Sequence, residues 1–118
     1  MQPKLRTELL QILRLLLQSK DWNSGARDNI YAMYAAIGLG AGDALKRTKS
    51  LFTWTDDERD RNQVILSLVE MLRYYYEPTK YFPKPNDEVF LLRVRAVVGQ
   101  HFPEVVYGEE PEQSQGPA

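Results

Sequence analysis

The chain has 118 residues and a formal net charge of −1, a length that suits one domain and is too short for two. Hydrophobic and charged residues make up 43% and 26%, as in ordinary globular proteins, without the strong basic excess of a nucleic-acid-binding domain. With no cysteine and one histidine, the sequence excludes disulfides, thiolate metal sites, thiol nucleophiles and histidine-rich metal sites.

Apolar residues at helical spacing predict the first two helices. In the first, over about 3–19, the repeating positions are Leu5, Leu9, Ile12, Leu13 and Leu16. The turn-forming residues 21–25 precede a second helix over about 26–39, whose repeating positions are Ile30, Met33, Tyr34 and Ile37. The glycine run at 38–42 then predicts the end of this helix and a tight turn.

Capping residues predict where the next two helices begin. Asp43 is a favourable N-cap and predicts a short third helix over about 44–52. Thr55 and Glu58 have the spacing of a capping box, which predicts a long fourth helix from about 56 to 76. Its wide apolar face makes it the expected central helix, packed with the helix at 3–19 in an antiparallel bundle.

The segment after residue 76 predicts one more helix and then a tail. Three prolines between 77 and 85 favour an extended connection, and a fifth helix begins at Asn86 or Asp87 and runs to about Gln100. Residues 108–118 lack large apolar side chains and are predicted to form a disordered acidic tail. The expected fold is all-α, a compact bundle of four main helices plus one short helix, formed by a helical domain over residues 1–107.

Two patterns that resemble cofactor sites lack the residues that such sites require. The glycine run at 38–42 follows a predicted helix rather than a strand, and its spacing is not that of a dinucleotide-binding loop. In the acidic stretch from Asp56, Arg61 and Ser67 occupy the positions where a calcium loop needs a glycine and a carboxylate. We therefore predict no cofactor and no metal ion.

The apolar run from Leu9 to Leu17 is the segment that most resembles a targeting signal. It is too short to cross a bilayer, and no small-residue cleavage site follows it. We expect a cytoplasmic protein that does not bind membranes.

An aromatic cluster at the end of the fourth helix is the least ordinary feature of the sequence. Three consecutive helical positions span about 200° of the helix surface, so Tyr74, Tyr75 and Tyr76 cannot all face one core. Tyr81 and Phe82 follow in the proline-rich connection. The simpler interpretation is that these tyrosines cover the open end of the bundle with their hydroxyls in water.

Tyrosine is favoured at protein interfaces because it combines a large apolar area with a polar tip. We therefore predict a protein-binding surface formed by Tyr74, Tyr75, Tyr76, Tyr81 and Phe82. The leading interpretation of the chain is a non-enzymatic interaction domain, an adaptor or accessory subunit of a larger assembly.

The spacing of Arg95 and His101 supports a second interpretation. This R-x5-H arrangement resembles the R-x(4–6)-H motif of the HEPN-family ribonucleases. The resemblance implies a small helical bundle that forms a homodimer, with His101 moving a proton and Arg95 stabilising the charge on phosphorus. The chain departs from the motif at Ala96, where that family usually has a polar residue.

A short basic cluster supports a third interpretation, contact with nucleic acid. Lys46, Arg47 and Lys49 are followed by the aromatic residues Phe52 and Trp54. Basic groups among aromatic rings hold single strands through phosphate contacts and base stacking. The alternative is that this cluster is an ordinary solvated face of a helix.

Overall fold

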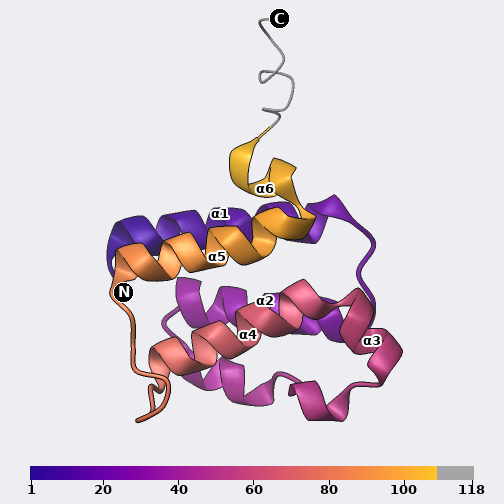
Figure 1. Cartoon of the computed structure of the whole chain (residues 1–118), viewed down its shortest axis with the longest axis horizontal. Helices are drawn as coiled ribbons and strands as arrows, with labels where there is room; N and C mark the ends of the chain where they lie inside the picture. The colour runs from indigo at the N-terminus through magenta and orange to yellow at the C-terminus, as the bar shows by residue number, and fades with distance from the viewer. Residues whose placement is uncertain (109–118) are drawn as a thin grey trace, which may run out of the picture.

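Four helices of 14 or more residues form the body of the molecule (Figure 1). The computed structural model describes residues 1–108, and its long helices are α1 (Pro3–Ser19), α2 (Ser24–Gly38), α4 (Gln63–Tyr76) and α5 (Asp87–His101). The shorter elements are the 3₁₀ helices η1 (Gly42–Arg47) and η2 (Leu51–Thr53) and the α-helices α3 (Asp56–Arg61) and α6 (Pro103–Tyr107). The described part of the chain has no strand, so the predicted all-α class is confirmed. Apart from Gly108, the tail predicted at 108–118 lies outside the described residues.

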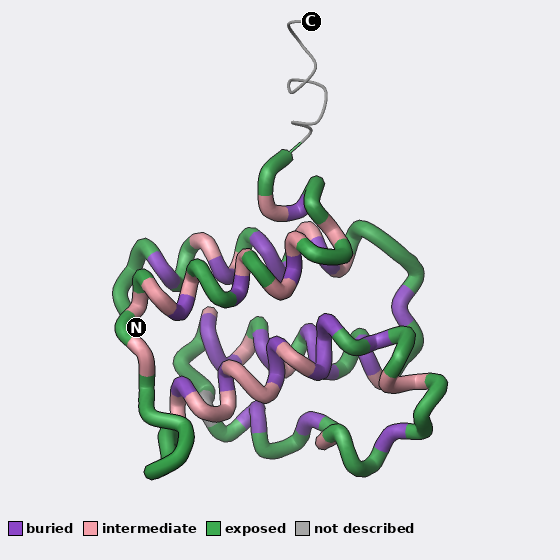
Figure 2. Tube along the Cα trace, viewed as in Figure 1, coloured by how far each residue is buried: buried purple, intermediate pink, exposed green. Residues whose placement is uncertain are grey.

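The hydrophobic core lies between the four long helices, whose buried residues recur on their inner sides (Figure 2). α1 contacts α2 and α5, and α4 contacts the same two helices. Side chains from all four helices meet at the centre, among them Leu9, Ile12, Met33, Ile37, Leu72 and Val94. The five apolar positions predicted on the first helix are all buried, as their spacing requires.

The helix directions match the predicted antiparallel bundle only in part. α1 runs antiparallel to α2 and to α4, and α4 runs antiparallel to α5 (Figure 1). α1 runs parallel to α5, since their first residues meet where the Gln2 backbone N–H donates to Asp87. α2 runs parallel to α4, because the segment from residue 39 to residue 62 returns along the bundle before α4 begins.

The third helix predicted over 44–52 is wrong, because tertiary hydrogen bonds replace helical ones at Thr48. η1 ends there, and the chain extends to the separate short helix η2. The Arg73 side chain donates to the backbone oxygen of Thr48 at 2.9 Å, and the Lys49 N–H donates to the Asn29 side chain at 3.3 Å. Asp43 lies inside η1 rather than at its N-cap.

The fourth helix predicted over 56–76 is interrupted at Asn62, which separates α3 from α4. Asn62 is buried, and its φ of −111° and ψ of 21° lie outside the helical region. α3 buries no residue, whereas α4 buries an apolar face against α2 and α5. The break therefore allows α3 to remain at the surface next to η2, while α4 packs in the core.

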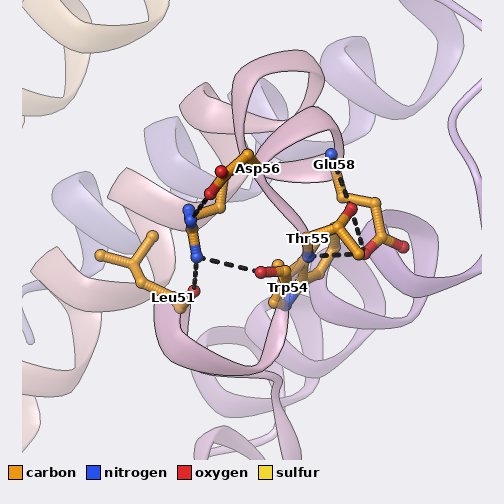
Figure 3. A network of polar contacts seen from close by, with 6 residues as sticks. Leu51, Trp54, Thr55, Asp56 and Glu58 are labelled. Atoms are coloured by element: carbon orange, nitrogen blue, oxygen red, sulfur yellow. Dashed lines mark hydrogen bonds and ion pairs between the residues drawn. The ribbon is translucent and has the colours of Figure 1, made fainter.

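The predicted capping box at the start of α3 is confirmed (Figure 3). The Glu58 N–H donates to the Thr55 hydroxyl at 3.2 Å, and the Thr55 N–H donates to the Glu58 carboxylate at 3.0 Å. The Thr55 hydroxyl also donates to this carboxylate at 3.0 Å, and the hydrogen bonds that the carboxylate accepts from the Thr55 N–H and hydroxyl hold the pKa of Glu58 below its usual value. Arg59 also links α3 to the preceding loop, because its side chain donates to the backbone oxygens of Leu51 and Trp54, each at 2.9 Å.

Replacing Thr55 with Ala is expected to lower the free energy of unfolding by about 1 kcal/mol, because the variant loses the cap of α3. Urea denaturation of the two proteins measures the difference. Thr55→Ser is the matched control, since serine keeps the hydroxyl that accepts from Glu58. Equal losses in the two variants would show that the hydroxyl is not the stabilising group.

The periodicity does not predict α6, which packs across the C-terminal ends of α1 and α5. Val105 is its buried residue. Tyr107 covers Gly99 of α5 so closely that a Cβ at this glycine would lie 3.3 Å from the tyrosine ring. Beneath α6, the Trp22 ring lies 5.7 Å from that of Phe102 and donates its Nε1–H to the Leu16 backbone oxygen.

Candidate functional site

The three tyrosines that end α4 point in three directions, as their consecutive positions require. Tyr75 is 3% exposed, and its ring centroid lies 4.7 Å from that of Phe90 in α5. Tyr74 and Tyr76 are half-buried on either side of it. Tyr75 was predicted to bind a partner, but its side chain belongs to the core, so the surface proposed below does not include it.

The Tyr75 hydroxyl joins three helix ends through Asp87. It donates to one carboxylate oxygen of Asp87 at 2.5 Å, and the other oxygen accepts the Gln2 backbone N–H at 2.8 Å. Burial, and then the hydrogen bond to Asp87, raises the pKa of Tyr75. The hydrogen bonds from Tyr75 and Gln2 lower the pKa of Asp87. The end of α4 and the starts of α1 and α5 are therefore held by one carboxylate.

Tyr76 faces α2, where its hydroxyl lies 3.5 Å from the backbone oxygen of Ala36. This distance is at the limit of a hydrogen bond, so the contact is weak. Burial raises the pKa of Tyr76. Part of this side chain packs against the core, and part of it remains exposed.

Tyr81 and Phe82 are presented by a braced turn in the connection between α4 and α5. The Thr79 N–H donates to the Phe82 backbone oxygen, and the Phe82 N–H donates to the Thr79 hydroxyl, both at 3.0 Å. The Phe82 ring stacks on Tyr74 of α4 with the centroids 4.3 Å apart. Tyr81 is 80% exposed and Phe82 53% exposed, so two large aromatic side chains face solvent on a fixed support.

Tyr74 separates two surface grooves. The first, which we call the aromatic groove, has a volume of about 590 Å³. Its apolar lining comprises Met71, Tyr74, Tyr81, Phe82, Phe90 and the prolines at 83 and 85. Its polar lining comprises Glu70, Lys84 and Arg93. The second groove, of about 500 Å³, lies toward η1 and has a more charged lining that includes Asp43, Lys46, Glu70, Arg73 and Glu77.

The charges around the aromatic groove are only partly balanced. Glu70 forms an ion pair with Arg73 at 2.9 Å, so its charge is already compensated. Lys84 lies 4.6 Å from the centroid of the Tyr75 ring and lowers the pKa of nearby Asp87. Within residues 1–108, neither Lys84 nor Arg93 forms an ion pair with a carboxylate. The groove therefore combines an apolar lining with two cations.

Arg95 and His101 of the R-x5-H arrangement have different surroundings. Arg95 forms an ion pair with Glu8 of α1 at 2.7 Å, and both side chains are half-buried. His101 is the exposed last residue of α5. No hydrogen bond joins the two residues in the part of the chain that the structure describes. Arg95 thus links α5 to α1, and the ribonuclease interpretation stays a prediction.

The basic cluster is exposed, but one of its two aromatic neighbours is not. Lys46, Arg47 and Lys49 all face solvent, and Lys46 lies 3.5 Å from the Asp43 carboxylate. Trp54 is buried beneath the Lys49 ammonium, which lies 5.4 Å from its ring centroid, so Trp54 is not available to stack on a base. Phe52, the other aromatic neighbour, is 93% exposed, so a base could reach its ring.

Sequence reasoning missed Met71, Lys84, Phe90 and Arg93 as groove residues. The spacing of Met71 and Tyr74, three residues apart on one helix, was a usable signal because such residues share a face. Arg93 gave no signal, since its approach to the connection depends on how α5 packs on α4.

No family model, curated protein or solved structure matches this chain. Among residues 1–108, no helix combines the length and the apolar character needed to cross a membrane. The same residues contain no group of three or more His, Asp or Glu side chains placed to hold a metal ion.

Proposed function

We propose that this chain is a non-enzymatic interaction domain, an adaptor or accessory subunit that binds a protein partner through the aromatic groove. The observation that carries the proposal is the exposure of Tyr81 and Phe82 on a braced turn beside an apolar groove. Large aromatic side chains are enriched at the centres of protein interfaces, where they contribute much of the binding energy.

The support of the turn strengthens this argument. Hydrogen bonds between Thr79 and Phe82, the stack of Phe82 on Tyr74, and nearby prolines all restrict the conformations of the turn. A surface that is already ordered loses less entropy when a partner binds.

The proposal is tested by affinity capture from the lysate of the native host with three forms of the tagged chain. These are the unchanged protein, a Tyr81→Ala, Phe82→Ala double variant, and Phe52→Ala as the matched control. Phe52 is also exposed, but it lies on η2, at the other end of the molecule in Figure 1.

We expect one protein to be recovered in stoichiometric amount by the unchanged chain and by Phe52→Ala, and to be lost from the double variant. Circular dichroism must show the same helix content in all three proteins. Equal recovery by the double variant would place the interface elsewhere. RNA recovered without protein would instead favour the basic cluster or Arg95 and His101.

A further inference from the structure

We infer that the aromatic groove binds a short acidic peptide segment that carries a large apolar side chain. This inference rests on the proposed function and deepens it, because it assigns the chemistry of the partner. The apolar lining and the two cations of the groove are the observations that support it.

The apolar lining requires an apolar group in the bound segment. Phe82 covers one side of the groove from the connection, and Tyr74 and Met71 line it from α4. A leucine or aromatic side chain placed among them would remove apolar surface from water on both partners, which is the main favourable term in association. The volume of about 590 Å³ lies within the range of sites that enclose a compact ligand.

The polar lining determines the charge of the segment. Lys84 and Arg93 come from the connection and from α5, so their two positive charges border the groove on neighbouring elements. Glu70 is the one carboxylate in the lining, and Arg73 already compensates it. A segment with carboxylates beside its apolar side chain would meet both cations, and charges arranged in this way favour the matching partner over others.

Two features favour a peptide over a nucleic acid. The groove offers two cations, whereas nucleic-acid binding usually depends on many phosphate contacts. The apolar lining around these cations is covered by a large apolar side chain of a peptide but not by a sugar-phosphate backbone.

The experiment is the selection of binders from a library of random ten-residue peptides displayed on phage, with the 118-residue chain immobilised. We expect the enriched peptides to carry net negative charge and at least one large apolar residue. The strongest is then synthesised with a fluorescent label, and its dissociation constant is measured by fluorescence anisotropy for the unchanged chain and three variants.

The variants separate the two parts of the site. Phe82→Ala and Arg93→Glu should each weaken binding about tenfold or more, the first by loss of apolar contact and the second by charge reversal. Arg27→Glu is the matched control and should bind as the unchanged chain does, because Arg27 is exposed on α2 at the end of the bundle away from the groove. Circular dichroism checks that each variant is folded.

Three results would overturn the inference, and they differ in what they say of the proposed function. Neutral or basic peptides that depend on Phe82 would refute the acidic assignment and leave the proposed interface intact. A library in which no enriched peptide depends on Phe82 would refute both. The third result concerns a synthetic peptide of residues 108–118, which contains Glu109, Glu110 and Glu112. If this peptide bound as tightly as the selected peptide, the occupant of the groove would be this chain's own tail.

Discussion

Replacing Phe90 with Ala is expected to lower the free energy of unfolding by about 3–5 kcal/mol. Phe90 is 2% exposed, packs against Tyr75 of α4 and belongs to the continuous hydrophobic core. Its truncation removes apolar surface from the core and leaves a cavity that the neighbouring side chains cannot close completely. A domain of this size is stabilised by about 5–15 kcal/mol in total, so the variant would lose a large share of its stability.

Leu92→Ala is the matched control for this measurement. Leu92 lies two residues further along α5, and it is 63% exposed, so its truncation should change stability by no more than about 0.5 kcal/mol. Urea denaturation followed by circular dichroism gives both values, and an unchanged slope shows that stability alone has altered. Similar losses in the two variants would contradict the packing of α5 described here. Because Phe90 also lines the aromatic groove, this variant is not suited to the binding experiments.

Replacing Asp87 with Ala is expected to lower the free energy of unfolding by about 2 kcal/mol, and Tyr75→Phe by about 1 kcal/mol. Asp87 accepts hydrogen bonds from the Tyr75 hydroxyl and the Gln2 N–H, and it is also a negative charge in the first turn of α5. Tyr75→Phe removes only one of these interactions. The double variant should lose less than the sum of the single losses, because both substitutions remove the same hydrogen bond.

The same pair makes stability depend on pH in two windows. The pKa of Asp87 is lowered by folding, so its contribution is complete above about pH 4 and is lost as the pH falls below that value. The pKa of Tyr75 is raised by folding, so its contribution is complete below about pH 10 and is lost as the pH rises above it. Unfolding at pH 3, 7 and 10.5 should therefore show a smaller acid loss in Asp87→Ala and a smaller alkaline loss in Tyr75→Phe. If the variants followed the unchanged chain at every pH, these two groups would not be the source of the dependence.

Local features of the sequence were sufficient to predict the helical class and most helix positions. The structure has helices at 3–19 and 87–101, close to the positions that the apolar repeats and the residues at their starts predict. The capping box at Thr55 and the cap at Asn86, which accepts the Val89 N–H, involve residues three apart and need no other part of the chain. The glycine turn after α2 is equally local, because Gly40 adopts a φ of 68° that glycine tolerates best.

The candidate site was only partly predictable, because it also depends on how the helices pack against one another. Helix geometry required that the three tyrosines diverge, but it could not say which of them the core would take. The packing of α5 on α4 buried Tyr75 against Phe90 and left Tyr74 at the surface. The ion pair of Arg95 could not be predicted from the sequence, because its partner Glu8 lies 87 residues away.

The sequence by itself therefore determined the all-α class, the approximate positions of the four long helices, the capping box at Thr55 and the presence of an aromatic cluster. Tertiary structure alone decided the break at Asn62, the replacement of the third helix by 3₁₀ turns, the helix directions, and the groove that combines Phe82 with Arg93. The physical reason is the range of the interactions involved. Caps and apolar repeats act within about one helical turn, whereas these other features depend on hydrogen bonds and contacts between residues far apart in the chain.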